Sequence, residues 1–311
     1  MDDALSKLES GAAALCLLAA ATLLALPLAN PDIFWHLSAG RWMAAHLAVP
    51  RADWLSFTKA GARWEDFEWV PELLYYGALR AGGAHALWAL KAAVLAGAGA
   101  LLWRLLGRCG AGPLGRAAGV LAWLLASPSG NDLRPENFSL VIFILLLDRL
   151  EAARLEGRSA ASRRELAGTA LLFAAWANLH AGYVYGLALL GLYGLAAAWR
   201  SRSARPFAPL AAAAAAVLAN PYGARIYAVP FEHWAALPEL ERYIFEWKEA
   251  SVLSPWLAPL WALMVLVFLA LAFRRWRTGR APFEHAALAA ALAWSAAEHV
   301  RTAPYFAAAA A

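Results

Sequence analysis

The sequence of 311 residues contains few charged side chains. Asp, Glu, Lys and Arg make up 16% of the chain, whereas hydrophobic residues make up 62% and the mean hydropathy is +0.51. Soluble domains contain about 25% charged and about 45–50% apolar residues, so an ordinary soluble protein is excluded. A disordered chain is excluded too, because it has little apolar surface to bury. The composition predicts a protein that crosses a membrane several times.

Cysteine is scarce, and the chain has no long basic run. Cys16 and Cys109 are the only cysteines, and they are expected at different depths of the membrane. We therefore expect no disulfide, and no cysteine spacing suggests a metal site. The net charge of +5 is not gathered into a basic tract, so we expect no nucleic-acid partner.

Long apolar runs predict an all-α, polytopic transmembrane protein with about 9–10 spans, since a span needs about 20 mostly apolar residues. The first, 11–29, carries no charge, and its flank lacks the basic region of a cleavable signal, so we expect an uncleaved helix. Further spans are predicted at 84–106, 112–128, 137–150, 166–180, 181–199, 206–220, 255–273 and 281–298. Residues 302–311 resemble the first half of a tenth span, and 1–311 is treated as a single transmembrane domain.

Arginines orient this arrangement. Fifteen of them fall in four predicted loops: Arg104, Arg108 and Arg116; Arg149, Arg154, Arg158, Arg163 and Arg164; Arg200, Arg202 and Arg205; and Arg274, Arg275, Arg277 and Arg280. With nine crossings, all four loops lie on the side of the N-terminus, which the positive-inside rule makes cytoplasmic. That side holds 16 of the 27 basic residues and 8 of the 22 acids, and we expect no polar set there as varied as on the other side.

Two segments on the opposite, external side are too long for simple turns, and long loops are usually functional. They are the first external loop, 30–83, and the second, 220–254, and both are rich in Trp. Within the first, apolar residues recur at helical spacing: Ile33, Leu37, Gly40, Ala44 and Leu47. We predict an amphipathic helix lying in the membrane interface, with aromatic side chains at the depth of the lipid headgroups.

The first external loop also supplies candidate catalytic residues. Asp32 directly follows the first span, either as a helix N-cap or as a general base, with His36 one turn later on the same face. Glu68 lies between Phe67 and Trp69 and is predicted to point inward. Its neighbours Glu65 and Asp66 are expected to be solvated.

Other polar residues map to the same external side. Arg134 could anchor the membrane interface or bind a phosphate, whose geometry guanidinium matches, and His180 could be structural or functional. Asn220 could cap a helix within a turn that includes Tyr222. Glu246 and Arg301 complete the set. Their shared side predicts one outward-facing polar site, suited to a substrate with a lipid tail and a polar head.

The order of motifs along residues 11–311 resembles a known family. An Asp-x-x-Trp-His-x-x-x-Gly stretch leads to Pro-x-x-Asp-x-x-Ser-x-Thr and then to Glu-Trp. The matching residues are Asp32, Trp35, His36, Gly40, Pro50, Asp53, Ser56, Thr58, Glu68 and Trp69, followed in order by LRPENFSLVIF, WANLHAGYVYGL, ANPYGARIY, FEWKEAS and RTAPYF. This pattern resembles bacterial membrane glycosyltransferases of the GT-C type, similar to protein O-mannosyltransferases and the aminoarabinose transferase of lipid A.

The resemblance implies an enzyme of the bacterial inner membrane that uses a polyprenyl-phosphate-linked sugar at its periplasmic or exterior face. The acceptor would be a lipid, a glycan or a protein. Asp32 matches the catalytic acid, which would accept a proton as the acceptor oxygen attacks the anomeric carbon with inversion. Arg134, His180 and Arg301 would stabilise the departing phosphate.

This chain also departs from the family pattern. Many members carry adjacent acids where Asp32 is followed by Ile33, which argues against metal assistance because a hard divalent ion prefers several oxygen ligands. Asp32, Glu68 and Glu246 could still form a metal site in space. The chain ends within the expected tenth span, so we expect a fragment or a short member.

Three alternatives remain beside sugar transfer. A transporter or lipid flippase would also tolerate broken helices and polar groups, but predicts a polar path through the membrane. An acyltransferase could use His180 with Asn178 or Asn220, although no flanking pattern supports it. A catalytically silent relative could act as a partner subunit.

Overall fold

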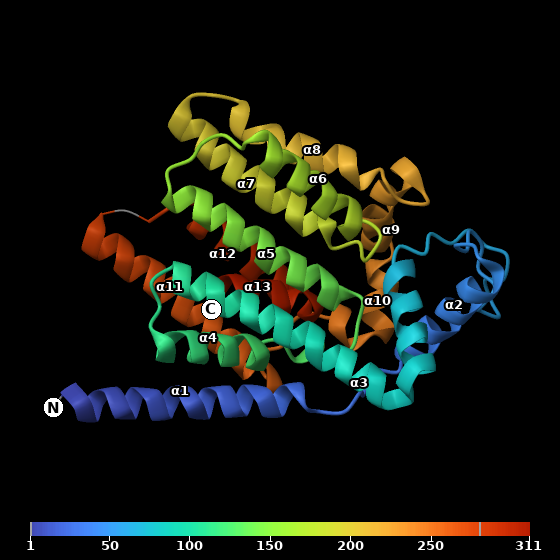
Figure 1. The fold of residues 1–311 in the computed structure, drawn as a ribbon, viewed down its shortest axis with the longest axis horizontal. Helices are drawn as coiled ribbons and strands as arrows, with labels where there is room; N and C mark the ends of the chain where they lie inside the picture. Colours follow the sequence, from blue (N-terminus) through green and yellow to red (C-terminus); the bar gives the residue numbers. More distant parts are fainter. Residues whose placement is uncertain (1, 280) are drawn as a thin grey trace.

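The computed structural model, which describes residues 2–279 and 281–311, is all-helical (Figure 1). The α-helices are α1 (Asp2–Leu24), α2 (Ile33–His46), α3 (Trp69–Arg108), α4 (Pro113–Leu125), α5 (Glu136–Leu155), α6 (Arg163–Trp176), α7 (Tyr183–Ser201), α8 (Ala208–Val217), α9 (Val229–Ala235), α10 (Leu237–Tyr243), α11 (Ala258–Thr278), α12 (Phe283–Glu298) and α13 (Ala303–Ala310). Short 3₁₀ turns are η1 (Pro128–Gly130), η2 (Arg205–Phe207), η3 (Gly223–Ala228), η4 (Phe245–Trp247), η5 (Pro255–Leu257) and η6 (Val300–Thr302). Arg280 lies outside the described residues.

Three of these helices are long and apolar enough to cross a membrane. They are formed by Ser6–Leu24, Trp69–Arg108 and Pro255–Thr278. Every other predicted span also coincides with a helix, but these helices are not both long and apolar enough to count as candidate spans. The structure is therefore that of an all-helical protein with three candidate membrane-spanning helices.

Helix α3 is bent at the predicted boundary between the first external loop, 30–83, and the span 84–106. Gly82 and Gly83 have non-helical backbone angles, and Gly83 has a φ of 62°. Only glycine adopts that positive φ without steric cost. The bend separates the first turns of α3, which carry candidate site residues, from the apolar stretch predicted as the span 84–106.

The buried core is built around the C-terminal helix. Figure 1 places α13 in the middle of the bundle, where it contacts α4, α5, α11 and α12. Tyr305 and Phe306 on α13 are at most 1% exposed and pack in the same cluster as Phe143, Trp123 and Trp176. Burying such aromatic side chains is a major source of stability.

Helix α2 confirms the helix predicted in the first external loop, but its packed face differs. The face against α3 includes Ile33, His36, Gly40 and Met43, whereas Leu47 is 92% exposed. Gly40 determines this packing, because a Cβ there would lie 2.2 Å from the carbonyl oxygen of Glu72. The close contact rotates α2 so that His36 points into the protein.

The arginine-rich ends of α3, α5 and α7 meet at one end of the bundle, as predicted. Asp148 on α5 accepts hydrogen bonds from Arg104 and Arg108, at 2.6 and 2.8 Å. Three of the acids at this end are not solvated. The carboxylates of Asp148, Glu151 and Glu284 are buried there, because each pairs with an arginine or a histidine.

Candidate functional site

Six of the predicted site residues line one cavity, at the opposite end of the bundle from these arginines. This polar cavity has a volume of about 610 Å³ and is lined by Asp32, His36, Glu68, Arg134, Glu246 and Arg301. They come from segments that are distant in sequence: the start of α2, the start of α3, the loop before α5, η4 and η6. The prediction that they gather in space is confirmed for these six.

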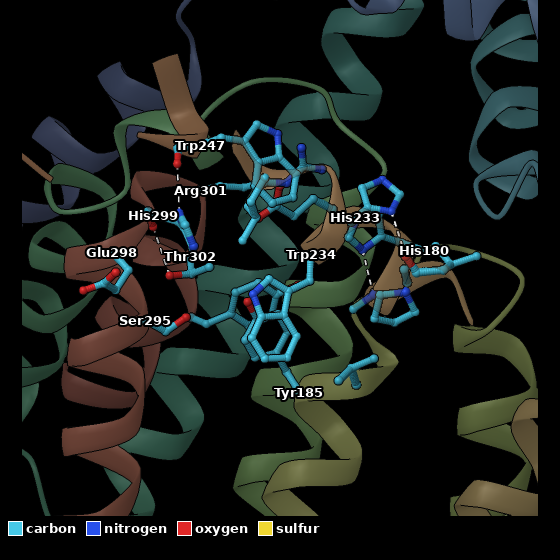
Figure 2. Close-up of a pocket in the computed structure, with 18 of the residues that line it drawn as sticks. His180, Tyr185, His233, Trp234, Trp247, Ser295, Glu298, His299, Arg301 and Thr302 are labelled. Atoms are coloured by element: carbon cyan, nitrogen blue, oxygen red, sulfur yellow. Dashed lines mark hydrogen bonds and ion pairs between the residues drawn. The ribbon is translucent and has the colours of Figure 1, made fainter. Parts of the chain in front are cut away.

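An adjoining cavity of about 630 Å³ is lined mainly by aromatic and apolar side chains. Figure 2 shows Tyr185, Trp234 and Trp247 around it, together with His180 and Arg301. This aromatic cavity and the polar cavity share lining residues: Phe67, Glu136, Val229, His233, Trp247 and Arg301. Polar and apolar regions are therefore contiguous, as an amphiphilic ligand would require.

Asp32 lies on the wall of the polar cavity, and its side chain does not cap a helix. It occupies the N-cap position of α2, but its side chain makes no capping hydrogen bond. Its Oδ2 accepts a hydrogen bond from Arg134 Nη2 at 2.9 Å, and the side chain is 46% exposed. A half-exposed carboxylate on a cavity wall can reach a ligand.

Arg134 and Arg301 are joined by one carboxylate. Arg134 binds both carboxylate oxygens of Glu246, and Arg301 Nη1 donates to Glu246 Oε1 at 3.1 Å. Arg134 is 8% exposed, so it does not extend to the interface as an anchor. Burial alone would lower its pKa, but hydrogen bonds to Glu246 and Asp32 raise it, so the guanidinium stays charged. Bidentate contacts of this kind suit carboxylates and phosphates alike.

A buried cluster of acids surrounds His36. Its Nδ1 lies 2.9 Å from Glu72 Oε1 and 4.0 Å from Glu68 Oε2. Burial lowers the pKa of His36 to about 3 and raises the pKa of Glu68 to about 8. At neutral pH we therefore expect a neutral imidazole and a protonated Glu68, because neither charged form is well solvated there.

His180 faces the same glutamate from the other side. Its Nδ1 accepts the backbone N–H of Gly182 at 2.9 Å, so in the neutral ring Nε2 carries the hydrogen. Nε2 lies 3.5 Å from Glu68 Oε1. Glu68 therefore bridges the two histidines, and its predicted inward orientation is confirmed.

The expectation that Glu65 and Asp66 are solvated was wrong. Asp66 is 2% exposed, and burial raises its pKa to about 6. Glu65 pairs with Arg63 and Arg225 at 2.8 and 3.0 Å, and its side chain is 10% exposed. Both acids fold inward because the second external loop, which carries Arg225, packs over the first.

Asn220 and Tyr222 lie outside both cavities and have structural contacts. Asn220 Oδ1 accepts the backbone N–H of Tyr222, and its Nδ2 donates to the carbonyl oxygens of Val217 and Gly223. The Tyr222 hydroxyl accepts the N–H of Asp66 and donates to the carbonyl of Pro50, both at 2.8 Å. Asn220 therefore caps the end of α8, as one interpretation of the sequence anticipated, whereas Tyr222 joins the two external loops.

Of the three acids that the sequence suggested for a metal site, only Glu68 belongs to the group that could hold one. Arg134 bonds to both Asp32 and Glu246, which is unfavourable for a cation between them. Within the described residues, one group has His and carboxylate donors all within 4.8 Å: His36, Glu68 and Glu72. Glu72 Oε2 has no hydrogen-bond partner. One imidazole and two carboxylates fit a Zn²⁺ or Mn²⁺ ion, which would polarise a nearby oxygen.

Sequence reasoning missed two glutamates and the aromatic walls. Glu72 lies four residues after Glu68, a spacing that puts both on one helix face and could have revealed it. Glu136 contacts Arg301 at 3.4 Å. The two residues are far apart in the sequence, so no local pattern could predict this contact. The aromatic cavity is formed by α7, α9 and α12, which the sequence does not relate to one another.

Comparisons with known proteins give no relative. No family model matches the chain, and neither a curated protein nor a solved structure matches it.

Proposed function

We propose that the chain is a membrane glycosyltransferase that moves a sugar from a polyprenyl-phosphate-linked donor to an acceptor hydroxyl. The observation that carries the proposal is the junction of the two cavities at Arg301 and Trp247. A donor of this class has an apolar tail, a phosphate and a sugar. The tail fits the aromatic cavity, the phosphate the arginines, and the sugar the polar cavity beside Asp32.

Asp32 acts as the general base in this proposal. The acceptor oxygen forms a bond to the anomeric carbon while the bond from that carbon to the phosphate oxygen breaks. The acceptor proton passes to the Asp32 carboxylate, and polyprenyl phosphate leaves with the electron pair. A single displacement inverts the anomeric centre. A positioned base contributes typically 10²–10⁴-fold to the rate.

Arg134 and Arg301 bind the phosphate that departs. Glu246 lies between their guanidinium groups, at 2.8 Å from Arg134 Nη2 and 3.1 Å from Arg301 Nη1. A phosphate of the donor competes with this carboxylate for the same N–H groups. Glu246 belongs to η4 in the second external loop. Movement of this loop would take the carboxylate away from the arginines when the donor phosphate binds.

The proposal includes a membrane arrangement. We place the helices as about nine or ten spans of a GT-C-like fold in a bacterial inner membrane. The arginine-rich end lies in the cytoplasm with the N-terminus, and the cavities open at the periplasmic or exterior face. Acceptors are lipids, glycans or proteins that present a hydroxyl there, and the lipid bilayer itself contacts the apolar helices.

A transfer assay with purified protein tests the reaction. Protein in lipid nanodiscs is incubated with polyprenyl phosphates that carry a radiolabelled hexose or pentose, and with an extract of membrane lipids and glycans as acceptors. We expect label to move from donor to acceptor with release of polyprenyl phosphate. Donors that bind but never transfer would favour a silent partner subunit, and movement of intact donor across vesicles would favour a flippase; either result overturns the proposal.

A further inference from the structure

A third cavity lies at the arginine-rich end, far from the proposed transfer site. It has a volume of about 300 Å³ and is bordered by α5, the loop that follows it, α6, α7 and the start of α8. Four guanidinium groups and a single carboxylate line it: Arg149, Arg154, Arg158, Arg200 and Glu165. Arginine therefore outnumbers acid in the lining, and nothing in the proposed reaction uses this cavity.

Two of the four arginines are positioned by buried acids. Glu151, which is 3% exposed, binds Arg154 Nη2 at 2.7 Å, and Glu284, which is 1% exposed, binds Arg200 Nη1 at 2.9 Å. Neither glutamate lines the cavity. A guanidinium group has five N–H donors, so each arginine keeps donors for a ligand after its buried carboxylate has fixed its position.

Arg149 adds charge that no acid balances. No carboxylate of the described residues forms an ion pair with it, and its side chain is exposed at the cavity. Arg158, in contrast, is bound by Glu156 and Glu165, both of them exposed. Arg149, Arg154 and Arg200 are therefore the groups best suited to an anion.

Most of the other lining residues are apolar. Side chains from α5 and α7, with one proline from η2 and one from α8, form this part: Leu146, Leu150, Leu190, Ala197, Pro206 and Pro209. A free phosphate gains nothing from such a wall, whereas the acyl chain of a membrane lipid can pack against it. Basic pockets between helices at a cytoplasmic surface commonly bind anionic headgroups.

We propose that this cavity binds an anionic phospholipid. Its phosphate contacts Arg149, Arg154 and Arg200, and an acyl chain lies along the apolar wall of α5 and α7. The site is independent of sugar transfer, because it shares no lining residue with the polar or the aromatic cavity.

Native mass spectrometry of the full chain in detergent tests the site. The protein is titrated with dioleoylphosphatidylglycerol or with dioleoylphosphatidylcholine, which has the same chains and no net charge. We expect at least tenfold tighter binding of the anionic lipid. Arg149→Gln, which breaks no ion pair, should weaken it about fivefold, and Arg149→Gln with Arg200→Gln should weaken it further. Arg275→Gln with Arg277→Gln, at the same end but outside the cavity, is the matched control and should bind normally.

Three results would overturn this site. Equal affinity for the two lipids would remove the role of charge. An equal loss in the control variant would show a general charge effect. Displacement of the lipid by millimolar inorganic phosphate would show that the arginines bind a free anion without the acyl chain.

Discussion

At the scale of single residues, the buried carboxyl of Glu68 makes the stability of the protein depend on pH. Its carboxyl is buried between His36 and His180, and burial raises its pKa from 4.5 to about 8. The folded protein therefore holds the proton more tightly than the unfolded chain does. Stability linked to Glu68 is fully present below pH 4.5 and is lost as the pH rises towards 8.

Glu68→Gln should reduce this loss, since the amide has the shape of the protonated acid and cannot ionise. We expect the melting temperature of the wild type to fall between pH 6 and pH 9, and that of the variant to fall less. Differential scanning fluorimetry across that pH range measures both melting temperatures. The exposed Glu249 supplies the control, and Glu249→Gln should follow the wild type. A parallel fall in Glu68→Gln would contradict the burial of a protonated acid.

His36 affects the pH dependence of stability in the opposite direction to Glu68. Because its pKa is lowered from 6.5 to about 3, its contribution is present above pH 6.5 and is lost as the pH falls towards 3. Their combined contribution to stability is therefore greatest between pH 4.5 and pH 6.5, which is mildly acidic.

Glu246 provides a second test at the residue scale. Glu246→Gln removes the negative charge between Arg134 and Arg301, so polyprenyl phosphate should bind about three- to tenfold tighter, because a neutral amide competes less well for guanidinium. Thermal shift against polyprenyl phosphate measures the affinity. Weaker binding in the variant would mean that Glu246 contacts the ligand favourably and does not compete with it.

At the scale of elements, the crossing of α2 and α3 aligns the acids around His36. The periodicity of residues 33–47 was enough to predict the helix, and it grouped Leu47 with Ile33 on one apolar face, whereas only Ile33 of the two is buried. Which residues face inward was determined by Gly40 meeting the backbone at Glu72, a contact between segments that no local pattern encodes. The sequence thus predicted the element and several site residues, and tertiary packing selected their orientation.

Gly40→Ala should therefore destabilise the protein by about 1–3 kcal/mol, the usual cost of overpacking. Gly77→Ala, in α3 with no atom within 4 Å of the added Cβ, should stabilise by about 0.5–1 kcal/mol because alanine favours helices. Chemical unfolding in detergent compares the two. Equal effects from both substitutions would argue against the close α2–α3 contact.

At the scale of the whole molecule, hydropathy and arginine distribution predicted the helices well. Each predicted span coincides with a helix, since apolar runs and loops are local properties. The two contiguous cavities and the buried acids at the arginine-rich end could not be predicted, because they depend on which helices become neighbours.

The proposed orientation can be tested by labelling intact cells with a membrane-impermeant maleimide. In a Cys16→Ala background, the exposed Cys109 at the arginine-rich end should not react until the cells are permeabilised. With Cys109→Ala and Phe57→Cys, at a position that is 99% exposed in the first external loop, labelling should need no permeabilisation. The reverse pattern would invert the topology and place the cavities in the cytoplasm.

The central claim is that the Asp32 carboxylate is the base of a sugar transfer. The most direct measurement is the single-turnover rate of Asp32→Asn with a donor already bound, beside the wild type and Glu249→Gln. We predict a rate at least about 10²-fold lower with donor affinity changed little, and normal transfer by the control. Transfer by Asp32→Asn at the wild-type rate would contradict the account.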